Sequence, residues 1–327
     1  MIEVTDLRKR YGVVEAVKGV SFSLGAEQVL GFLGPNGAGK TTIMKILTGY
    51  HFPTAGTAKV DGISVEEDPV EVKKRIGYLP EAVPLYGDLT VREYLSFMAR
   101  ARLLSREEGR RAVEAGIESC GLAGMAYRRI DTLSKGYRQR VGLAQAIIHD
   151  PPILILDEPT TGLDPNQIIE IRSLIKELGK RKTVLLSTHI LQEVEAVATQ
   201  VLIIHEGRIA AQGRPDEIAA SLKGGDTWDL LLKGAGAEAV KEKLDKFALS
   251  AGFELSSLTA EDGGGGTVRA GFFLAGEGDA PRSAPGEQLF DWAVMEGLKL
   301  LEMNRRKFSL EDIFVKLTGD SAGEERL

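Results

Sequence analysis

Short, continuously apolar runs alternate with segments of helical periodicity over roughly the first 210 residues of the chain. Four of these runs are QVLGFLG, PILILDEP, TVLLSTH and TQVLIIHEG, at residues 28–34, 152–159, 183–189 and 199–207. Strands that are buried on both faces have this continuous apolar character. Because helical segments separate the runs, the pattern predicts an α/β domain.

Two other regions have different patterns. Residues 84–130 have the periodicity of consecutive amphipathic helices and predict a helical insert. Beyond LKGGD, residues 222–226, the order strand, helix, strand, strand, helix, strand predicts a small ferredoxin-like module, and residues 309–319 predict a closing helix. We expect an α/β domain over 1–220 with a helical subdomain at about 84–150, an accessory α+β domain over 225–318, and a tail over 319–327.

The composition argues against nucleic-acid binding, an internal disulfide and a membrane-spanning segment. The formal net charge of −6 gives no bulk electrostatic reason to bind nucleic acid, so we expect no nucleic-acid partner. Cys120 is the single cysteine, which excludes an internal disulfide and fits a reducing compartment. No apolar run approaches the roughly 20 residues that span a bilayer. We therefore expect a soluble, cytoplasmic protein, and any membrane-spanning partner must be another chain.

A glycine-rich segment, GPNGAGKTT at residues 34–42, follows the first apolar run and matches G-x-x-x-x-G-K-[ST]. It opens a helical stretch, which is the context that a phosphate-binding loop requires. The glycines let backbone N–H groups turn toward phosphate oxygens, Lys40 adds a positive charge, and the Thr41 hydroxyl can bind Mg²⁺. Rather than an incidental turn, we predict a nucleotide site formed by Gly34, Pro35, Asn36, Gly37, Ala38, Gly39, Lys40, Thr41 and Thr42.

Two acidic residues end the apolar run ILILDEP, at the strand end where ligands bind in open α/β sheets. Asp157 can hold the magnesium shell there. Glu158 is placed to polarise a water that attacks the γ-phosphate, a role we prefer to helix capping because the phosphate loop is present. His189 ends the next strand. A lone histidine is more often structural, but because the phosphate loop and the two acids are present, we expect His189 to take part in the chemistry of the site.

Two further candidates come from less specific patterns. Tyr11, between the first two apolar segments, could stack on an adenine ring or serve as an ordinary strand residue, and its position leaves both roles open. In DTLSKGYRQRVG, Ser134 and Gly136 stand at the start of an amphipathic helix, where an anion can bind. Arg138 and Arg140 lie off the apolar stripe of that helix, and we expect them to be solvated charges.

Together these segments resemble the nucleotide-binding subunit of ABC transporters, over about residues 2–216. LSKGY, residues 133–137, is similar to the family signature LSGGQ, with Lys135 and Tyr137 in place of glycine and glutamine. The resemblance implies a P-loop ABC ATPase domain with a helical insert, to which the small ferredoxin-like domain is appended. TTGLD at 160–164 resembles the D-loop that follows the Walker B strand, and His189 resembles the switch histidine.

In that family two domains pack head to tail, and each signature contacts the γ-phosphate held by the other domain. The resemblance therefore implies a homodimer in which Ser134 and Gly136 contact the ATP of the partner. Glu81 stands where the family has its Q-loop glutamine. It can still bind the metal, but it brings a full charge. The implied cofactors are ATP and Mg²⁺, with Thr41, Glu81 and Asp157 around the metal and Glu158 and His189 as catalytic residues.

The resemblance also implies the function. The chain would hydrolyse ATP to drive a separate integral-membrane permease, which would hold it on the cytoplasmic face of the inner membrane and dock near residues 81–97. The two departures, the PLY…LTVREYL segment and SLEDIFVKLTG resemble an exporter subfamily that includes gliding-motility and copper-maturation ATP-binding proteins.

The alternative is a soluble ABC-type ATPase acting in ribosome, DNA or iron–sulfur assembly processes. The single nucleotide domain, the negative charge and the lack of a coiled coil make this alternative less favoured. For the C-terminal module we favour a dimer-stabilising cap over a ligand-sensing domain.

Overall fold

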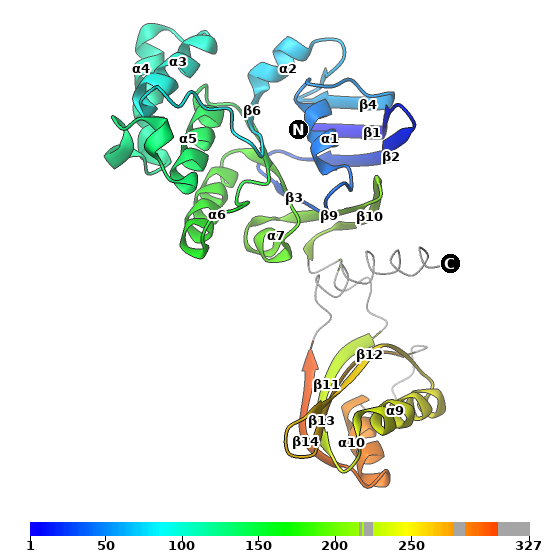
Figure 1. The fold of residues 1–327 in the computed structure, drawn as a ribbon. Helices are drawn as coiled ribbons and strands as arrows, with labels where there is room; N and C mark the ends of the chain where they lie inside the picture. Colours follow the sequence, from blue (N-terminus) through cyan, green and yellow to red (C-terminus); the bar gives the residue numbers. More distant parts are fainter. Residues whose placement is uncertain (216–217, 219–224, 277–284, 307–327) are drawn as a thin grey trace. The chain divides into compact units, whose positions relative to one another are not determined.

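The computed structural model describes residues 1–215, 218, 225–276 and 285–306 of the chain. They form two compact units, one over Met1–Pro215 and one that lies within Asp216–Lys316 (Figure 1). The first unit contains two hydrophobic cores and the second contains one. The predicted closing helix at 309–319 and the tail at 319–327 lie outside the described residues.

A six-stranded sheet forms the centre of the first unit, in the order β10-β9-β3-β8-β7-β6. The five strands from β9 to β6 run parallel, and β10 pairs antiparallel with β9. Every residue of β3, β7 and β8 is buried, so the apolar runs are strands covered on both faces, as predicted. The strands are β3 (Val29–Leu33), β6 (Ile76–Leu79), β7 (Ile153–Asp157), β8 (Thr183–Thr188), β9 (Gln200–His205) and β10 (Arg208–Gly213).

Alternate residues of the central strands enter two different cores. Ile153 and Ile155 of β7 face the core that contains helix α1 (Lys40–Leu47) and a second, four-stranded sheet. Leu154 and Leu156 face the opposite core, which contains the helical insert. This alternation follows from the two-residue period of a strand. The second sheet is antiparallel, in the order β2-β1-β4-β5, with β1 (Ile2–Tyr11), β2 (Val14–Leu24), β4 (Ala55–Val60) and β5 (Ile63–Ser64).

Residues 84–130 contain two α-helices and short 3₁₀ turns joined by loops, and no strand element, which confirms the predicted helical insert. Thr90 and Ser105 start the first two helices of the insert, each in a capping box with the glutamate three residues later. The helices of the first unit, besides α1, are α2 (Pro69–Arg75), α3 (Val91–Ala101), α4 (Arg106–Ser119), α5 (Lys135–Ile147), α6 (Pro165–Gly179) and α7 (Leu191–Val197), with short 3₁₀ turns η1 (Ala123–Met125) and η2 (Ile130–Thr132).

In the part of the second unit that the structure describes, an antiparallel sheet in the order β12-β13-β11-β14 is joined by two helices. This order and the βαββαβ sequence of elements confirm the predicted ferredoxin-like module. Trp228 and Trp292 lie in its core, as expected of packing residues. The elements are β11 (Gly225–Lys233), α9 (Ala237–Ala251), β12 (Phe253–Gly263), β13 (Thr267–Gly276), α10 (Pro285–Met295) and β14 (Lys299–Arg306). Among the described helices of both units, none has the length and apolar character needed to cross a bilayer.

Candidate functional site

The glycine-rich loop joins β3 to α1 and can exist only with glycines at its tightest points. A Cβ atom on Gly34 would lie 2.3 Å from the carbonyl oxygen of Ile204, and one on Gly39 would lie 2.7 Å from that of Ala16. Gly39 also has a φ of 107°, in the region that favours glycine. The loop is therefore wedged between neighbouring backbone segments, which fixes its course before any ligand binds.

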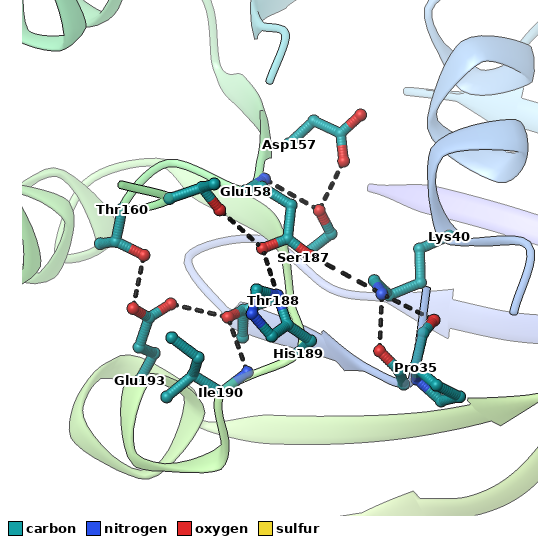
Figure 2. Close-up of polar contacts among 12 residues, drawn as sticks. Pro35, Lys40, Asp157, Glu158, Thr160, Ser187, Thr188, His189, Ile190 and Glu193 are labelled. Carbon is teal, nitrogen blue, oxygen red and sulfur yellow. Dashed lines mark hydrogen bonds and ion pairs between the residues drawn. The ribbon is translucent and has the colours of Figure 1, made fainter. Parts of the chain in front are cut away.

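Lys40 turns back into this loop. Its ammonium donates to the carbonyl oxygens of Gly34 at 2.6 Å and Pro35 at 3.1 Å, and lies 3.7 Å from Oε1 of Glu158 (Figure 2). The residue is only 5% exposed. Burial lowers the pKa of Lys40, while Glu158 and Asp157 act in the opposite direction. A buried cation held within this loop is suited to binding phosphate oxygens.

Asp157 ends β7, and one of its carboxylate oxygens is held by two hydroxyls. Its Oδ1 accepts from the hydroxyls of Ser187 at 2.6 Å and Thr41 at 3.2 Å. The Ser187 hydroxyl also accepts from the backbone N–H of Glu158 at 3.0 Å. Ser187, at the end of β8, thus positions both acids. Sequence reasoning missed it, although its place near a strand end, two residues before His189, was a signal that could have found it.

Glu158 has an unusual backbone and a crowded carboxylate. Its φ of 48° lies in the left-handed region, which costs free energy in a residue other than glycine. Its Oε2 lies 2.9 Å from Nδ1 of His189 and accepts from the Thr161 hydroxyl at 3.1 Å. Because a carboxylate only accepts, the histidine contact requires a proton on Nδ1. Contacts with Lys40, Thr161 and His189 together therefore fix the orientation of the Glu158 carboxylate.

These groups border a cleft of about 370 Å³. The lining comes from the phosphate loop and from the segments that follow strands β6, β7 and β8. Its residues are Asn36, Gly37, Ala38, Gly39, Lys40, Thr41, Thr42, Glu81, Glu158, Thr161 and His189. Most of the predicted phosphate-loop residues thus meet Glu81, Glu158 and His189 in one place. Thr161, from the segment that resembles the D-loop, was not among the predicted site residues.

Oxygen ligands suitable for Mg²⁺ lie beside this cleft. Thr41 Oγ1 and Asp157 Oδ1 are 3.2 Å apart, and Glu81 lines the same cleft. Within the described residues, no group of three or more histidine, cysteine or acidic side chains is arranged to hold a metal. This donor set fits Mg²⁺, because the ion is usually held by one or two carboxylates together with substrate phosphates and water.

Tyr11 does not line the cleft. It ends β1, is partly exposed, and meets the ring of His51 edge-on with 5.7 Å between ring centroids. The ammonium of Lys9 lies 5.2 Å from the centroid of the Tyr11 ring. The structure thus gives Tyr11 an aromatic neighbour from the segment after α1, and its role in binding adenine stays a prediction.

The signature residues also lie outside the cleft lining. Ser134 is exposed and caps α5, with its hydroxyl accepting from the N–H of Tyr137. Gly136 is buried against Gln167 at the start of α6. The prediction that Arg140 is a solvated charge is wrong, because its guanidinium donates to the carbonyl oxygen of Cys120 and pairs with Glu170. Arg140 therefore joins α5 to α4 and α6.

Comparison with known proteins decides the family. Residues 17–161 match the ABC transporter protein family. Over 317 residues the chain is 34% identical to YxlF, an uncharacterized ABC transporter ATP-binding protein of Bacillus subtilis (strain 168), and the match covers 97% of this chain and 99% of that protein. This chain belongs to the ABC transporter ATP-binding proteins. It is an ATPase subunit of that family, as the sequence predicted.

Other members of the ABC family give the same picture. The chain is 33% identical over 331 residues to a Nod factor export ATP-binding protein I of Burkholderia orbicola (strain AU 1054), covering 97% of each protein. A solved dimeric structure of MJ0796, a bacterial ABC transporter cassette, aligns with a TM-score of 0.61 and 25% identity over 65% of this chain and 98% of that one. Neither YxlF nor the Nod factor protein is named for gliding motility or copper maturation, so that narrower assignment stays a prediction.

Proposed function

We propose that this ABC ATPase works as a homodimer on the cytoplasmic face of the inner membrane, where it drives an integral-membrane permease that exports its substrate. The observation that carries the proposal is the convergence of Lys40, Glu158 and His189 at one cleft, with 3.7 Å and 2.9 Å between the paired atoms. A base, a cation and a second polar group are thereby fixed around the position of the reacting phosphate.

The residues of the cleft divide the chemistry among them. Lys40 and the N–H groups of the loop bind the phosphates of ATP, and Thr41, Asp157 and Glu81 would hold Mg²⁺, which neutralises phosphate charge when bound. Glu158 orients the attacking water and accepts its proton, leaving hydroxide oxygen to bond with the γ-phosphorus as ADP departs. His189 keeps the Glu158 carboxylate turned toward the cleft. Catalysis rests on position and charge, since phosphoryl transfer needs little else from the protein.

A second copy of the chain would complete each site. Ser134 and Gly136 begin α5 outside the cleft lining, and the loop, the acids and His189 already converge without them. A helix start with free N–H groups can bind the γ-phosphate of a partner subunit. The dimeric cassette of MJ0796 supports this arrangement. ATP bound between two copies would stabilise the closed dimer, and loss of the γ-phosphate would open it.

Exposed aromatic residues support a permease-docking surface near residues 81–97. Tyr86 and Phe97 are both exposed, and their rings meet edge-on with 5.6 Å between centroids. Aromatic side chains outside a core are typical of protein interfaces. Glu81, at the start of this segment, lines the cleft, so a docked permease helix could act on the site. We favour export because a full-length relative is a Nod factor export protein.

Replacement of Glu158 by glutamine tests the catalytic part of this proposal. Glu158→Gln removes the proton acceptor but keeps the shape of the side chain, so we expect ATP binding to persist and turnover to fall at least about 100-fold. ATP should then hold the variant as a dimer, measured by light scattering. Glu195→Gln, on the exposed side of α7, is the matched control. Wild-type turnover in Glu158→Gln would remove Glu158 from its assigned role.

The same variant tests the partner. Tagged Glu158→Gln chain is isolated under ATP from gently solubilised native membranes, and its partners are identified by mass spectrometry. An equal amount of a multispan membrane protein is the expected result, and its sequence narrows the substrate class. Recovery with ribosomal or assembly proteins from the soluble fraction would contradict the transport role and leave the ATPase chemistry intact.

A further inference from the structure

A buried carboxylate lies behind the cleft and belongs to none of the motifs described so far. Glu193, on α7, is only 2% exposed. Its neighbour Glu195 on the same helix is exposed. Because burying a charge costs several kcal/mol unless it is paired, an apolar residue would fill this space more favourably. The carboxylate therefore needs partners, and the identity of those partners indicates what it does.

Both oxygens of Glu193 are bound, each to a different segment (Figure 2). Oε1 accepts from the hydroxyl of Thr160, and the Arg172 guanidinium lies 3.9 Å away. Oε2 accepts from the hydroxyl of Thr188 at 2.7 Å. The Thr188 hydroxyl in turn accepts from the N–H of Ile190 at 3.0 Å. One carboxylate thus links the loop after β7 to the turn after β8.

These two segments carry the proposed catalytic residues. Thr160 follows Glu158 by two positions, and Thr188 and Ile190 flank His189 on both sides. The side chain of His189 is 43% exposed, so packing does not fix it. Its placement depends on its backbone and on its contact with Glu158. Anything that holds the two segments together therefore also holds the 2.9 Å contact between them.

We propose that Glu193 is a positioning residue, which holds His189 against Glu158 by joining Thr160 to Thr188. The inference rests on the roles proposed above for Glu158 and His189. Thr160 begins the segment that resembles the D-loop, so the same carboxylate connects that loop to the histidine of its own chain. A shift of that loop would be passed to His189 through two hydroxyl bonds.

The experiment compares Glu193→Ala, Glu193→Gln and the control Glu195→Ala in the full-length chain, by ATP turnover and thermal unfolding. Alanine removes both bonds, so we expect kcat to fall on the order of 10- to 100-fold, as for a small misplacement of a catalytic group. The KM for ATP should change less than about twofold, because the phosphate loop is untouched. Glutamine can still accept from Thr188 and donate to Thr160, and should restore much of the rate. The control should behave as wild type.

A double mutant separates positioning from general stability. In a His189→Ala background, Glu193→Ala should lower kcat by less than about a further twofold, since residues that act through one another are not additive. The inference would be overturned if the kcat losses of the two single variants multiplied in the double variant, or if Glu193→Ala alone had a wild-type kcat. If Glu193→Ala does not fold, Thr188→Val carries the test by removing a single hydroxyl, and wild-type kcat there has the same meaning.

Failure of the inference is distinguishable from failure of the proposed function. If Glu158→Gln and His189→Ala both keep wild-type turnover, the assigned roles are wrong and Glu193 has nothing to position. If those two variants lose activity while Glu193→Ala does not, only the positioning role is wrong.

Discussion

The cleft and the start of α5 were predicted from motifs of the same kind, but the structure treats them differently. Lys40, Asp157 and Glu158 are all buried and joined to one another or to shared hydroxyls. Ser134 is exposed, and the bond found for its side chain is the cap of its own helix. Gly136 packs against a flexible glutamine side chain. The cleft residues of the proposed site are buried and bonded within the chain, whereas the Ser134 side chain at the start of α5 is exposed.

This difference shows what a single chain of this family can build. Parallel strands bring their carboxyl ends to one edge, so residues from β3, β7 and β8 meet without help from another molecule. Burial then keeps these polar side chains bonded to one another, because a buried polar group without a hydrogen-bond partner costs free energy. At the start of α5 the Ser134 side chain is exposed, so we expect its chemistry to depend on a molecule that docks there.

The largest effect is expected from mixing two inactive variants. Lys40→Ala removes the phosphate cation, and Ser134→Arg blocks the start of α5 with a bulky side chain. Each alone should lose more than about 100-fold of the ATPase rate, because charge stabilisation at the reacting phosphate is lost. In a head-to-tail dimer, a mixed pair has one site with intact Lys40 and an intact partner Ser134. Random pairing then restores about a quarter of the wild-type rate.

The mixture also distinguishes the two geometries. If α5 served the cleft of its own chain, every mixed dimer would carry one defect in each site, and the mixture would stay as inactive as its components. A mixture of Lys40→Ala with Lys40→Ala,Ser134→Arg is the control, because it contains no chain with an intact cleft. Recovery in that control would show that the assay measures a contaminating ATPase.

A smaller effect is expected from Ser187→Ala. The Ser187 hydroxyl donates to Asp157 and accepts from the N–H of Glu158, so its loss removes one of two hydroxyl bonds to Asp157 and a bond that holds the backbone of Glu158. Groups that orient metal ligands typically contribute about 10- to 100-fold to affinity or activity, so we expect about a 10-fold loss of rate and a higher Mg²⁺ requirement, measured by titration with Mg²⁺. Ser173→Ala on the exposed side of α6 is the control. An unchanged Mg²⁺ requirement would separate Ser187 from the metal site.

Most of the fold and half of the site follow from local sequence. Strands buried on both faces need unbroken apolar runs, and a wedged phosphate loop needs glycines, so β3, the loop and β7 can be found from short segments. The order of strands and helices in the ferredoxin-like module can be predicted for the same reason, because the hydrophobic periodicity of each segment distinguishes a strand from a helix.

What the sequence did not predict depends on contacts between distant segments. Ser187 and Glu193 have no motif of their own, and their importance comes from acids and hydroxyls brought close by folding. Arg140 looked solvated from helical spacing, but the folded chain places it beside Cys120 and Glu170. A periodicity shows which side of a helix a residue occupies, and it does not show which neighbour covers that side.

The smallest effects are expected from adding one methyl group to each half of the site. On Gly34 a Cβ would lie 2.3 Å from the backbone oxygen of Ile204, which cannot move alone, so Gly34→Ala should lower the free energy of unfolding by about 1–3 kcal/mol. On Gly136 it would meet the end of the Gln167 side chain at 2.5 Å, which can turn away. Gly136→Ala should therefore change stability by less than about 0.5 kcal/mol. Urea unfolding of both variants, and of Gly136→Ala with Gln167→Ala, measures the difference. Equal losses would mean that the start of α5 is as rigidly packed as the phosphate loop.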